Sequence, residues 1–307
     1  MRQQINNPEI SRKTQAEIKL TTVNSNGCKK KSIKHPAHKW HEWHHIMFDK
    51  KIGVLGAVET HLSAAQALEI QDSHLGRHME IYNSPNLDDP STRGVAIVLN
   101  RELTSTKGVK IHYLIPRRAI LAVIPWHGKR TLTALVVYAP AESMDENEAF
   151  WDEMTNLWMT IDLPVPNWVG GDTNNVEEPI NQLPHRHHSS KPVYCFQNSC
   201  KHLLGLLDGW RRVNPNTKAY TYTSTHHSTT HLRINCIYVS PALMKNCSRW
   251  TIHNVGKVTD HRMVSVVVSA PGSPYIGCGL YSILLFLLEE NFFIKFVIDQ
   301  GVDKPAL

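Results

Sequence analysis

Acidic residues stand at the borders of apolar segments at three places in the chain. Glu59 follows one apolar run, Asp172 follows another, and the pair Asp260-His261 comes just before a third. A carboxylate at the end of an apolar strand is partly desolvated, and binding a divalent cation offsets that cost. Carboxylate and amide oxygens suit Mg²⁺ or Mn²⁺, and a neighbouring histidine can carry a proton. The residue types therefore indicate metal-assisted proton chemistry.

Amide and phenol side chains stand at similar borders. Asn24 follows the β-branched segment 18–23, Tyr138 ends another apolar segment, and Asn174 comes two residues after Asp172. If the strands belong to one sheet, their polar ends would meet at one edge. Taken singly, each residue is better explained as part of a turn, a cap or a solvated loop. Their order and spacing together favour a site.

Apolar periodicity and turn residues predict the elements that must position these side chains. Strands are predicted at 18–23, 53–58, 94–99, 109–114, 119–124, 132–138, 168–171, 220–223, 234–240, 250–254 and 263–269. Helices are predicted around 40–47, 63–74, 145–161 and 197–206. Because most neighbouring elements are both strands, we expect an α+β fold, a four-layer α/β-sandwich with two packed, mostly antiparallel sheets flanked by helices.

Composition narrows the class of protein. The chain has 307 residues, of which 41% are hydrophobic and 20% charged, and this excludes a disordered tail or a coiled-coil rod. The net charge of +6 mildly favours a polyanionic partner. Six cysteines without a CxxC pair predict reduced thiols and an intracellular protein. No secretory signal is visible, and charges interrupt the apolar stretch 280–298, so we expect no membrane partner.

Six ordered motifs resemble those of the endonuclease/exonuclease/phosphatase superfamily, with the strongest likeness to the endonuclease domain of LINE-type retrotransposons. They are Val23-Asn24-Ser25-Asn26-Gly27, Val58-Glu59-Thr60-His61-Leu62, Val137-Tyr138-Ala139-Pro140, Gly170-Gly171-Asp172-Thr173-Asn174, Tyr220-Thr221 and Thr259-Asp260-His261. The resemblance implies a nuclease-like domain at 17–270, after a loose extension at 1–16. It also implies that 271–307 is the remnant of a linker toward a missing reverse transcriptase.

The resemblance implies a Mg²⁺- or Mn²⁺-dependent endonuclease that nicks DNA. Glu59 and Asp260 would serve the metal, and Asp172 would orient or deprotonate the attacking water. The other implied catalytic residues are Asn174, which fixes that water, His261 and Tyr138, which donate to the phosphate, Asn24, and Asn235 behind His261. We expect DNA as the partner, no obligate protein partner, a monomer, and a nuclear location.

Three positions depart from the family pattern. Asn235 stands where the family usually has an aspartate that accepts a hydrogen bond from the catalytic histidine. Val58 replaces a usual glutamine and Thr173 an aromatic residue. An acid-to-amide change behind a catalytic histidine can hold the wrong tautomer. The departures predict a slow or decayed enzyme.

Basic residues near the motifs are candidates for contacts with DNA phosphates. The candidates for nucleic-acid binding are Lys29, Lys30, Lys31, Lys34, Arg93, Arg117, Arg118 and Thr221. The lysines fit a solvated, flexible loop equally well.

Other interpretations remain open. The chain could be a catalytically dead remnant that binds nucleic acid, or a phosphatase acting on a phosphorylated small molecule or lipid. A zinc site among His41, His44 and His45, or around Cys195 and Cys200, fits no recognised spacing. The apolar segment 284–297 fits either a helix packed on the domain or an exposed face prone to aggregation.

Overall fold

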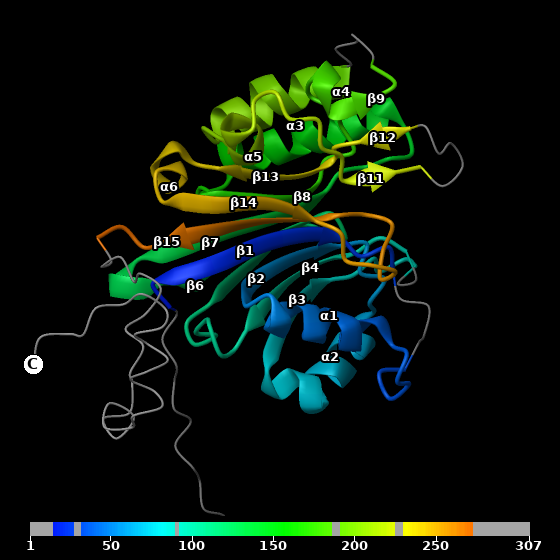
Figure 1. Ribbon diagram of the computed structural model, residues 1–307, viewed down its shortest axis with the longest axis vertical. Helices are drawn as coiled ribbons and strands as arrows, with labels where there is room; N and C mark the ends of the chain where they lie inside the picture. The colour runs from blue at the N-terminus through cyan, green and yellow to red at the C-terminus, as the bar shows by residue number, and fades with distance from the viewer. Residues whose placement is uncertain (1–14, 28–31, 90–91, 186–190, 225–229, 273–307) are drawn as a thin grey trace, which may run out of the picture. The chain divides into compact units, whose positions relative to one another are not determined.

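Two six-stranded sheets form the centre of the structure (Figure 1). The computed structural model describes residues 15–27, 32–89, 92–185, 191–224 and 230–272. The first sheet has the strand order β14-β15-β1-β2-β4-β3 and the second β10-β13-β8-β7-β6-β5, while β11, β12 and β9 form a small third sheet. Only β1 with β2 and β7 with β8 pair in parallel in the two large sheets.

Each predicted strand and helix overlaps an element of the structure, and the structure adds β3, β9, β10, β12, α5 and α6, which were not predicted. The strands are β1 Glu17–Asn24, β2 Ile52–Val58, β3 Met79–Ser84, β4 Val95–Asn100, β5 Lys110–Ile115, β6 Ala119–Pro125, β7 Thr131–Tyr138, β8 Trp168–Asp172, β9 Gln182–Leu183, β10 Leu207–Asp208, β11 Tyr222–Thr223, β12 His231–Leu232, β13 Asn235–Val239, β14 Cys247–His253 and β15 Met263–Ser269. The α-helices are α1 Lys39–Asp49, α2 Ala64–Asp72, α3 Met144–Thr160, α4 Lys191–Cys195, α5 Gly209–Val213 and α6 Pro241–Met244. Short helical turns occupy His74–Arg77, His127–Lys129, Pro179–Asn181 and Phe196–Lys201.

The core confirms the predicted sandwich. Leu20 and Val54 of the first sheet belong to one buried cluster with Val136 and Ile237 of the second, so the sheets pack face to face. Helix α1 covers the outer side of the first sheet and α3 that of the second (Figure 1). Trp40, Trp43 and Met47 of α1 are buried and form the side of this helix that faces the core.

Two predicted helices differ in detail from the structure. Ser63 and Gln66 form a capping box at the start of α2, but the helix ends at Asp72, before the predicted end at 74, and a short helical turn follows. The segment predicted as a helix at 197–206 instead begins earlier, at Lys191, and continues as a π-helical turn. Residue Leu183 precedes a cis proline near the small third sheet, a loop region that the sequence left without an assignment.

The chain divides into two units, residues 1–271 and 272–307. The second unit lies almost entirely outside the described residues, as do most of the predicted extension 1–16 and the apolar segment 284–297. Their assignments stay predictions. Within the described residues, no helix combines the length and the apolar character needed to cross a membrane. Cys195, Cys200, Cys236 and Cys247 are free thiols.

Candidate active site

The polar residues at the strand borders come together because of strand direction and register. In the first sheet Asn24, the last residue of β1, pairs with Val58, the residue before Glu59. In the second sheet Tyr138 and Asp172, the last residues of β7 and β8, pair with each other. Parallel neighbouring strands have their carboxyl ends on the same side of a sheet. Packing of the two sheets then brings these strand ends together on one side of the molecule.

Asn24 joins the carboxylates of the two sheets. Its side-chain nitrogen Nδ2 donates to Glu59 Oε1 over 2.8 Å and to Asp172 Oδ2 over 3.0 Å. Its own oxygen accepts the backbone N–H of Asn26 at 2.9 Å. The hydroxyl of Thr259 donates to the Asn24 carbonyl at 2.9 Å and so ties the segment before His261 to β1. One amide therefore fixes the separation of two acids that are distant in sequence.

Asp172 is buried, and no fixed cation of the described residues lies against it. The side chain is 1% exposed, and its Oδ1 accepts the backbone N–H of Asn174 at 3.0 Å. Burial raises the pKa of the Asp172 carboxyl, while His261 and the Asn24 amide act in the opposite direction. Among the described residues, the ion-pair partners of the two acids are histidines: His261 lies 3.8 Å from Asp172, and His61 lies 3.9 Å from Glu59.

His261 lies between an amide and an aromatic ring. Its Nδ1 is 2.7 Å from Asn235 Oδ1, and the ring of Tyr222 lies 4.7 Å away at an angle of 33°. Asn235 is fully buried, and its Nδ2 has no hydrogen-bond partner within the described part of the chain. A neutral amide does not favour the charged imidazolium as a carboxylate does. The departure from the family pattern therefore leaves an orphaned donor behind the histidine.

Tyr138 stays protonated at this edge. The residue is 6% exposed, and burial raises the pKa of its phenol, as do the charge and hydrogen bond of Glu59 and the charge of Asp172. The guanidinium carbon of Arg118 lies 4.8 Å from the centre of the Tyr138 ring, and its Nη1 donates to the Tyr138 carbonyl at 3.3 Å. The phenol is thus a fixed proton donor beside two carboxylates.

Strained loop residues surround the acids. Glu59, His61, Asn26 and Asn174 all have positive φ values between 47° and 50°. Such conformations are uncommon outside glycine, and they cluster at functional sites where the surrounding structure holds them. The Asn174 side chain donates to the Ala139 carbonyl at 2.8 Å, so its nitrogen is committed to the backbone.

Asn147 of α3 clamps the two loops that follow β7 and β8. Its Nδ2 donates to the carbonyls of Pro140 at 2.7 Å and Thr173 at 3.2 Å. Its oxygen accepts the side-chain N–H groups of Trp151 and Asn175, both at 2.8 Å. Sequence reasoning missed Asn147, because a lone asparagine inside a helix gives no sign of its contacts.

His61, Thr259 and Tyr222 are further residues at the site that the sequence did not single out. His61 and Thr259 stand within quoted motifs, two residues after Glu59 and one before Asp260. Their position inside the motifs was the signal that could have found them. Tyr222 forms a β-bridge with His261, a pairing that links segments about forty residues apart and leaves no local pattern.

The donor set at the strand ends fits a hard divalent cation. Glu59 and Asp172 supply carboxylate oxygens held by neutral amides, an arrangement that leaves their negative charge without a built-in counterion. Asp260 is exposed and accepts from Asn26 Nδ2 at 2.9 Å. Mg²⁺ commonly takes one or two protein carboxylates and completes its shell with water and phosphate.

A second acidic group lies on the outer helices. In the described part of the chain, the one trio of His, Cys, Asp or Glu ligand atoms within 4.8 Å of one another belongs to Glu148, Asp152 and Cys195. Burial and the two carboxylates raise the pKa of the Cys195 thiol, which is therefore a hydrogen-bond donor to them. This group does not belong to the strand-end site. No histidine trio of the kind considered for zinc occurs among the described residues.

The residues predicted to contact nucleic acid differ in whether they are exposed. Lys29, Lys30 and Lys31 lie outside the described residues, and Lys34 is exposed. Thr221 is fully buried, and its hydroxyl accepts the backbone N–H groups of Ile234 and Asn235 at 3.0 and 2.9 Å. It therefore holds the start of β13 and cannot face nucleic acid, which corrects the expectation.

The predicted arginines are all engaged within the chain. Arg93 donates to Glu142 at 2.6 Å, and Arg117 donates to Asp88 at 2.9 Å. Arg118 is 5% exposed and also pairs with Glu142, at 3.3 Å. Arg93 and Arg117 remain open to solvent, whereas Arg118 supports Tyr138 from below the surface.

Comparison with known sequences gives one informative relative. No protein-family model matches the chain. An uncharacterised 149 kDa protein of the transposon TX1 from Xenopus laevis is 31% identical over 173 residues, which make up 55% of this chain. The same segment is 13% of that protein, so the chain spans a small part of its relative.

Solved structures share the fold. The AP endonuclease LMAP from Leishmania major superposes with a TM-score of 0.66 at 16% identity, over 83% of this chain and 89% of that chain. The 3′ phosphatase NExo from Neisseria, bound to a product DNA hairpin, gives 0.60 at 20% identity, over 81% and 98%. The endonuclease domain of TRAS1, a telomere-specific non-LTR retrotransposon, gives 0.58 at 12% identity, over 83% and 99%.

Proposed function

We propose that the chain is a divalent-metal-dependent phosphodiesterase that nicks DNA, of the kind encoded by non-LTR retrotransposons. The chain has the fold of the endonuclease/exonuclease/phosphatase superfamily, as its motifs predicted. The single observation that carries the proposal is the Asn24 amide, which donates to Glu59 after the end of β2 and to Asp172 at the end of β8. Two acids held together by a neutral group are a ready site for a cation. The transposon relative supports the retroelement origin.

Glu59 would hold the metal, with Asp260 close by. When bound, Mg²⁺ or Mn²⁺ neutralises charge on the phosphate and stabilises the leaving oxygen. Asn24 keeps the Glu59 and Asp172 carboxylates at a fixed separation, so that one acid can serve the metal while the other serves the water. The two acids can perform these two roles without movement of either strand end.

Asp172 would orient and deprotonate the attacking water. Its burial raises its pKa, which makes the carboxylate a better proton acceptor than a solvated aspartate. The backbone N–H of Asn174 holds Asp172 Oδ1, so that Oδ2 faces the side of Asn24 and His261. Asn174 would act by fixing this loop, through its backbone and through its bond to Ala139.

Tyr138 and His261 would donate hydrogen bonds to the phosphate oxygens as negative charge builds. The phenol of Tyr138 keeps its proton, since burial and both acids raise its pKa. Asn235 would orient the His261 ring through their hydrogen bond. In-line attack by water would leave a 3′-hydroxyl and a 5′-phosphate, and the 3′-hydroxyl can prime DNA synthesis.

Basic residues around the strand ends would bind the phosphates of the DNA. Lys34, Arg93 and Arg117 are the described basic residues that we assign to phosphate contacts, together with Lys29, Lys30 and Lys31, which follow β1 in the sequence. Such contacts make affinity fall steeply with salt. The chain would work as a monomer, because the strand-end site is built from one chain, and in the nucleus, where its substrate lies.

Nicking of a supercoiled plasmid tests the proposal. With Mg²⁺ we expect conversion to open circles that carry 3′-hydroxyl ends, and no conversion in EDTA. Glu59→Gln and Asp172→Asn should both abolish nicking. Glu148→Gln, which alters the acidic group on the outer helices, is the matched control and should nick like the wild type. No nicking by the wild type, or equal nicking by Glu59→Gln, would reject the proposal.

A catalytically dead protein that binds DNA is the second candidate, favoured by one observation. The buried Nδ2 of Asn235 has no partner within the described part of the chain, so the amide leaves one hydrogen-bond donor unsatisfied behind His261. Asn235→Asp restores the family residue and removes that orphaned donor. Salt-sensitive DNA binding without nicking, in the wild type and in this variant, would favour the second candidate.

A further inference from the structure

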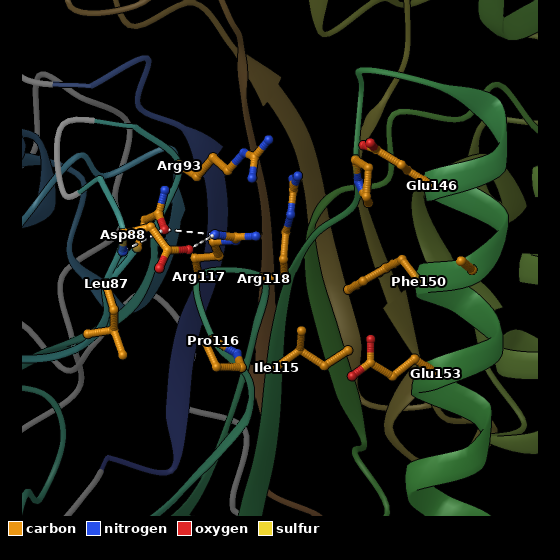
Figure 2. Close-up of a pocket in the computed structure, with 13 residues that line it drawn as sticks. Leu87, Asp88, Arg93, Ile115, Pro116, Arg117, Arg118, Glu146, Phe150 and Glu153 are labelled. Atoms are coloured by element: carbon orange, nitrogen blue, oxygen red, sulfur yellow. Dashed lines mark hydrogen bonds and ion pairs between the residues drawn. The ribbon is translucent and has the colours of Figure 1, made fainter.

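A pocket of about 550 Å³ lies between helix α3 and the turn that joins β5 to β6 (Figure 2). It adjoins the strand-end site, because Pro140, two residues after Tyr138, lines it. A pocket of this size is large enough for one nucleotide. None of the residues assigned to the cutting reaction lines it, so it needs a separate explanation.

Arginines form one wall of the pocket. Arg93 and Arg117 both have left-handed backbones, with φ values of 61° and 62°, and Figure 2 shows their side chains directed toward α3. Arg117 is held by Asn86 Oδ1 at 2.8 Å and by Asp88 Oδ2 at 2.9 Å. The Asp88 side chain is 86% exposed, and an exposed ion pair contributes little stability. An incoming phosphate can therefore replace Asp88 at low cost.

Helix α3 forms the opposite wall with one of its faces. Glu146, Ala149, Phe150 and Glu153 line the pocket at the spacing i, i+3, i+4 and i+7. The small Ala149 leaves room beside the Phe150 ring. Neither Glu146 nor Glu153 forms an ion pair with another described residue, and Figure 2 shows both directed toward the arginine wall.

We propose that this pocket binds a nucleotide flanking the cut, with its phosphate on Arg117 and Arg93 and an amino-bearing base against the carboxylates of Glu146 and Glu153. The assignment extends the proposed function and rests on it for the identity of the ligand as DNA. Apolar contact with Phe150 and Ile115 covers the base, and Ile115 is already part of the buried core behind the pocket.

The carboxylates give the pocket a base preference. Adenine, cytosine and guanine carry an exocyclic amino group that donates to a carboxylate, whereas thymine carries carbonyl oxygens and a methyl group. Thymine has one donor on that edge, its N3–H between two carbonyl oxygens, so at least one of the two carboxylates then faces an acceptor. A lost or repulsive contact of this kind lowers affinity about tenfold. The pocket is then a determinant of target-site preference.

Binding of the four deoxynucleoside 5′-monophosphates to the full chain, in EDTA and low salt, tests the proposal without any cutting. Chemical-shift titration should show dAMP, dCMP and dGMP binding about tenfold more tightly than dTMP. Arg117→Ala should weaken all four. The double variant Glu146→Gln and Glu153→Gln should keep binding but remove the preference against dTMP, because an amide both donates and accepts.

Matched controls lie outside the pocket. Arg249→Ala removes an exposed, ion-paired arginine, and Glu148→Gln changes another acid of α3, so both should bind all four nucleotides like the wild type. Equal binding of the four nucleotides by the wild type, or an unchanged preference in the Glu146 and Glu153 double variant, would overturn the inference. Because the titration needs no metal and no cutting, its failure would leave the nicking result intact, and a failure to nick would not change the titration.

Discussion

Two polar clusters, each with a buried asparagine and a carboxylate of low exposure, differ in their counterions. Around Asn181, the acid Asp208 pairs with Arg233, which is 2% exposed, and the Asn181 oxygen accepts from Arg233 and Arg211. Around Asn24, the acids Glu59 and Asp172 accept hydrogen bonds from the neutral Asn24 amide. The first cluster carries its cations within the chain.

The difference separates a structural cluster from a candidate site. A buried acid with a fixed guanidinium is electrically complete. Here Arg233, just before β13, pairs with Asp208 of β10 and donates to Asn181, just before β9. The acids at the strand ends have no lysine or arginine among their described ion-pair partners, so a cation from solution would complete them. Burial therefore stabilises one cluster as it stands and prepares the other to bind.

The largest expected effect is on catalysis, at Asp172. Asp172→Asn keeps the shape of the side chain but removes the proton acceptor, so plasmid nicking should fall by about 10²–10⁴-fold. The matched change in the other cluster, Asp208→Asn, should leave the nicking rate per folded molecule close to that of the wild type. Equal losses in both variants would show that the two clusters do not differ in role.

The next effect is on stability, at Arg233. Arg233→Met leaves Asp208 buried without its partner and should lower the free energy of unfolding by about 3–5 kcal/mol, measured by urea denaturation. Arg249→Met, which breaks the exposed pair with Glu17, should cost at most about 1 kcal/mol. A small loss at Arg233 would mean that this cluster is not held by its charges.

The third prediction concerns Asn235, which comes two residues after Arg233 and is hydrogen-bonded to His261 at the strand-end site. Asn235→Asp should raise nicking about tenfold or more, because a carboxylate favours the charged form of His261 and removes the orphaned Nδ2. The readout is the initial rate of open-circle formation at saturating Mg²⁺. An unchanged rate would show that the amide does not limit the wild type.

The sequence predicted the strand-end site better than its surroundings. Glu59, Asp172 and Asn24 follow apolar runs, and this pattern is visible without coordinates. The hydrogen bond from Asn24 to Asp172 and the ion pairs of Arg117 and Arg118 were not predictable, because they depend on side-chain direction across loops. The edge strand β3 was missed, since its half-buried, polar sequence lacks an apolar run.

The smallest expected effect is the pH dependence of stability at Asp172. Because its pKa is raised in the folded state, the folded protein keeps this proton to higher pH than the unfolded chain does. The resulting stability is present below the unfolded pKa and is lost as the pH rises through the folded pKa. In Asp172→Asn the side chain carries no charge at any pH, so the variant does not lose stability in this way as the pH rises.

Urea denaturation in EDTA between pH 4 and pH 7 measures that effect. The variant should gain stability relative to the wild type as the pH rises, since only the wild type must then bury a charge. A difference between wild type and Asp172→Asn that is constant with pH would contradict the assigned cause.

Counting bound Mn²⁺ by electron paramagnetic resonance tests the central claim most directly. The wild type should bind one ion that Mg²⁺ displaces, Glu59→Gln should lose it, and Glu148→Gln and Asp208→Asn should keep it. Retention of the ion by Glu59→Gln, or its loss from Glu148→Gln alone, would contradict a cation site at the strand ends.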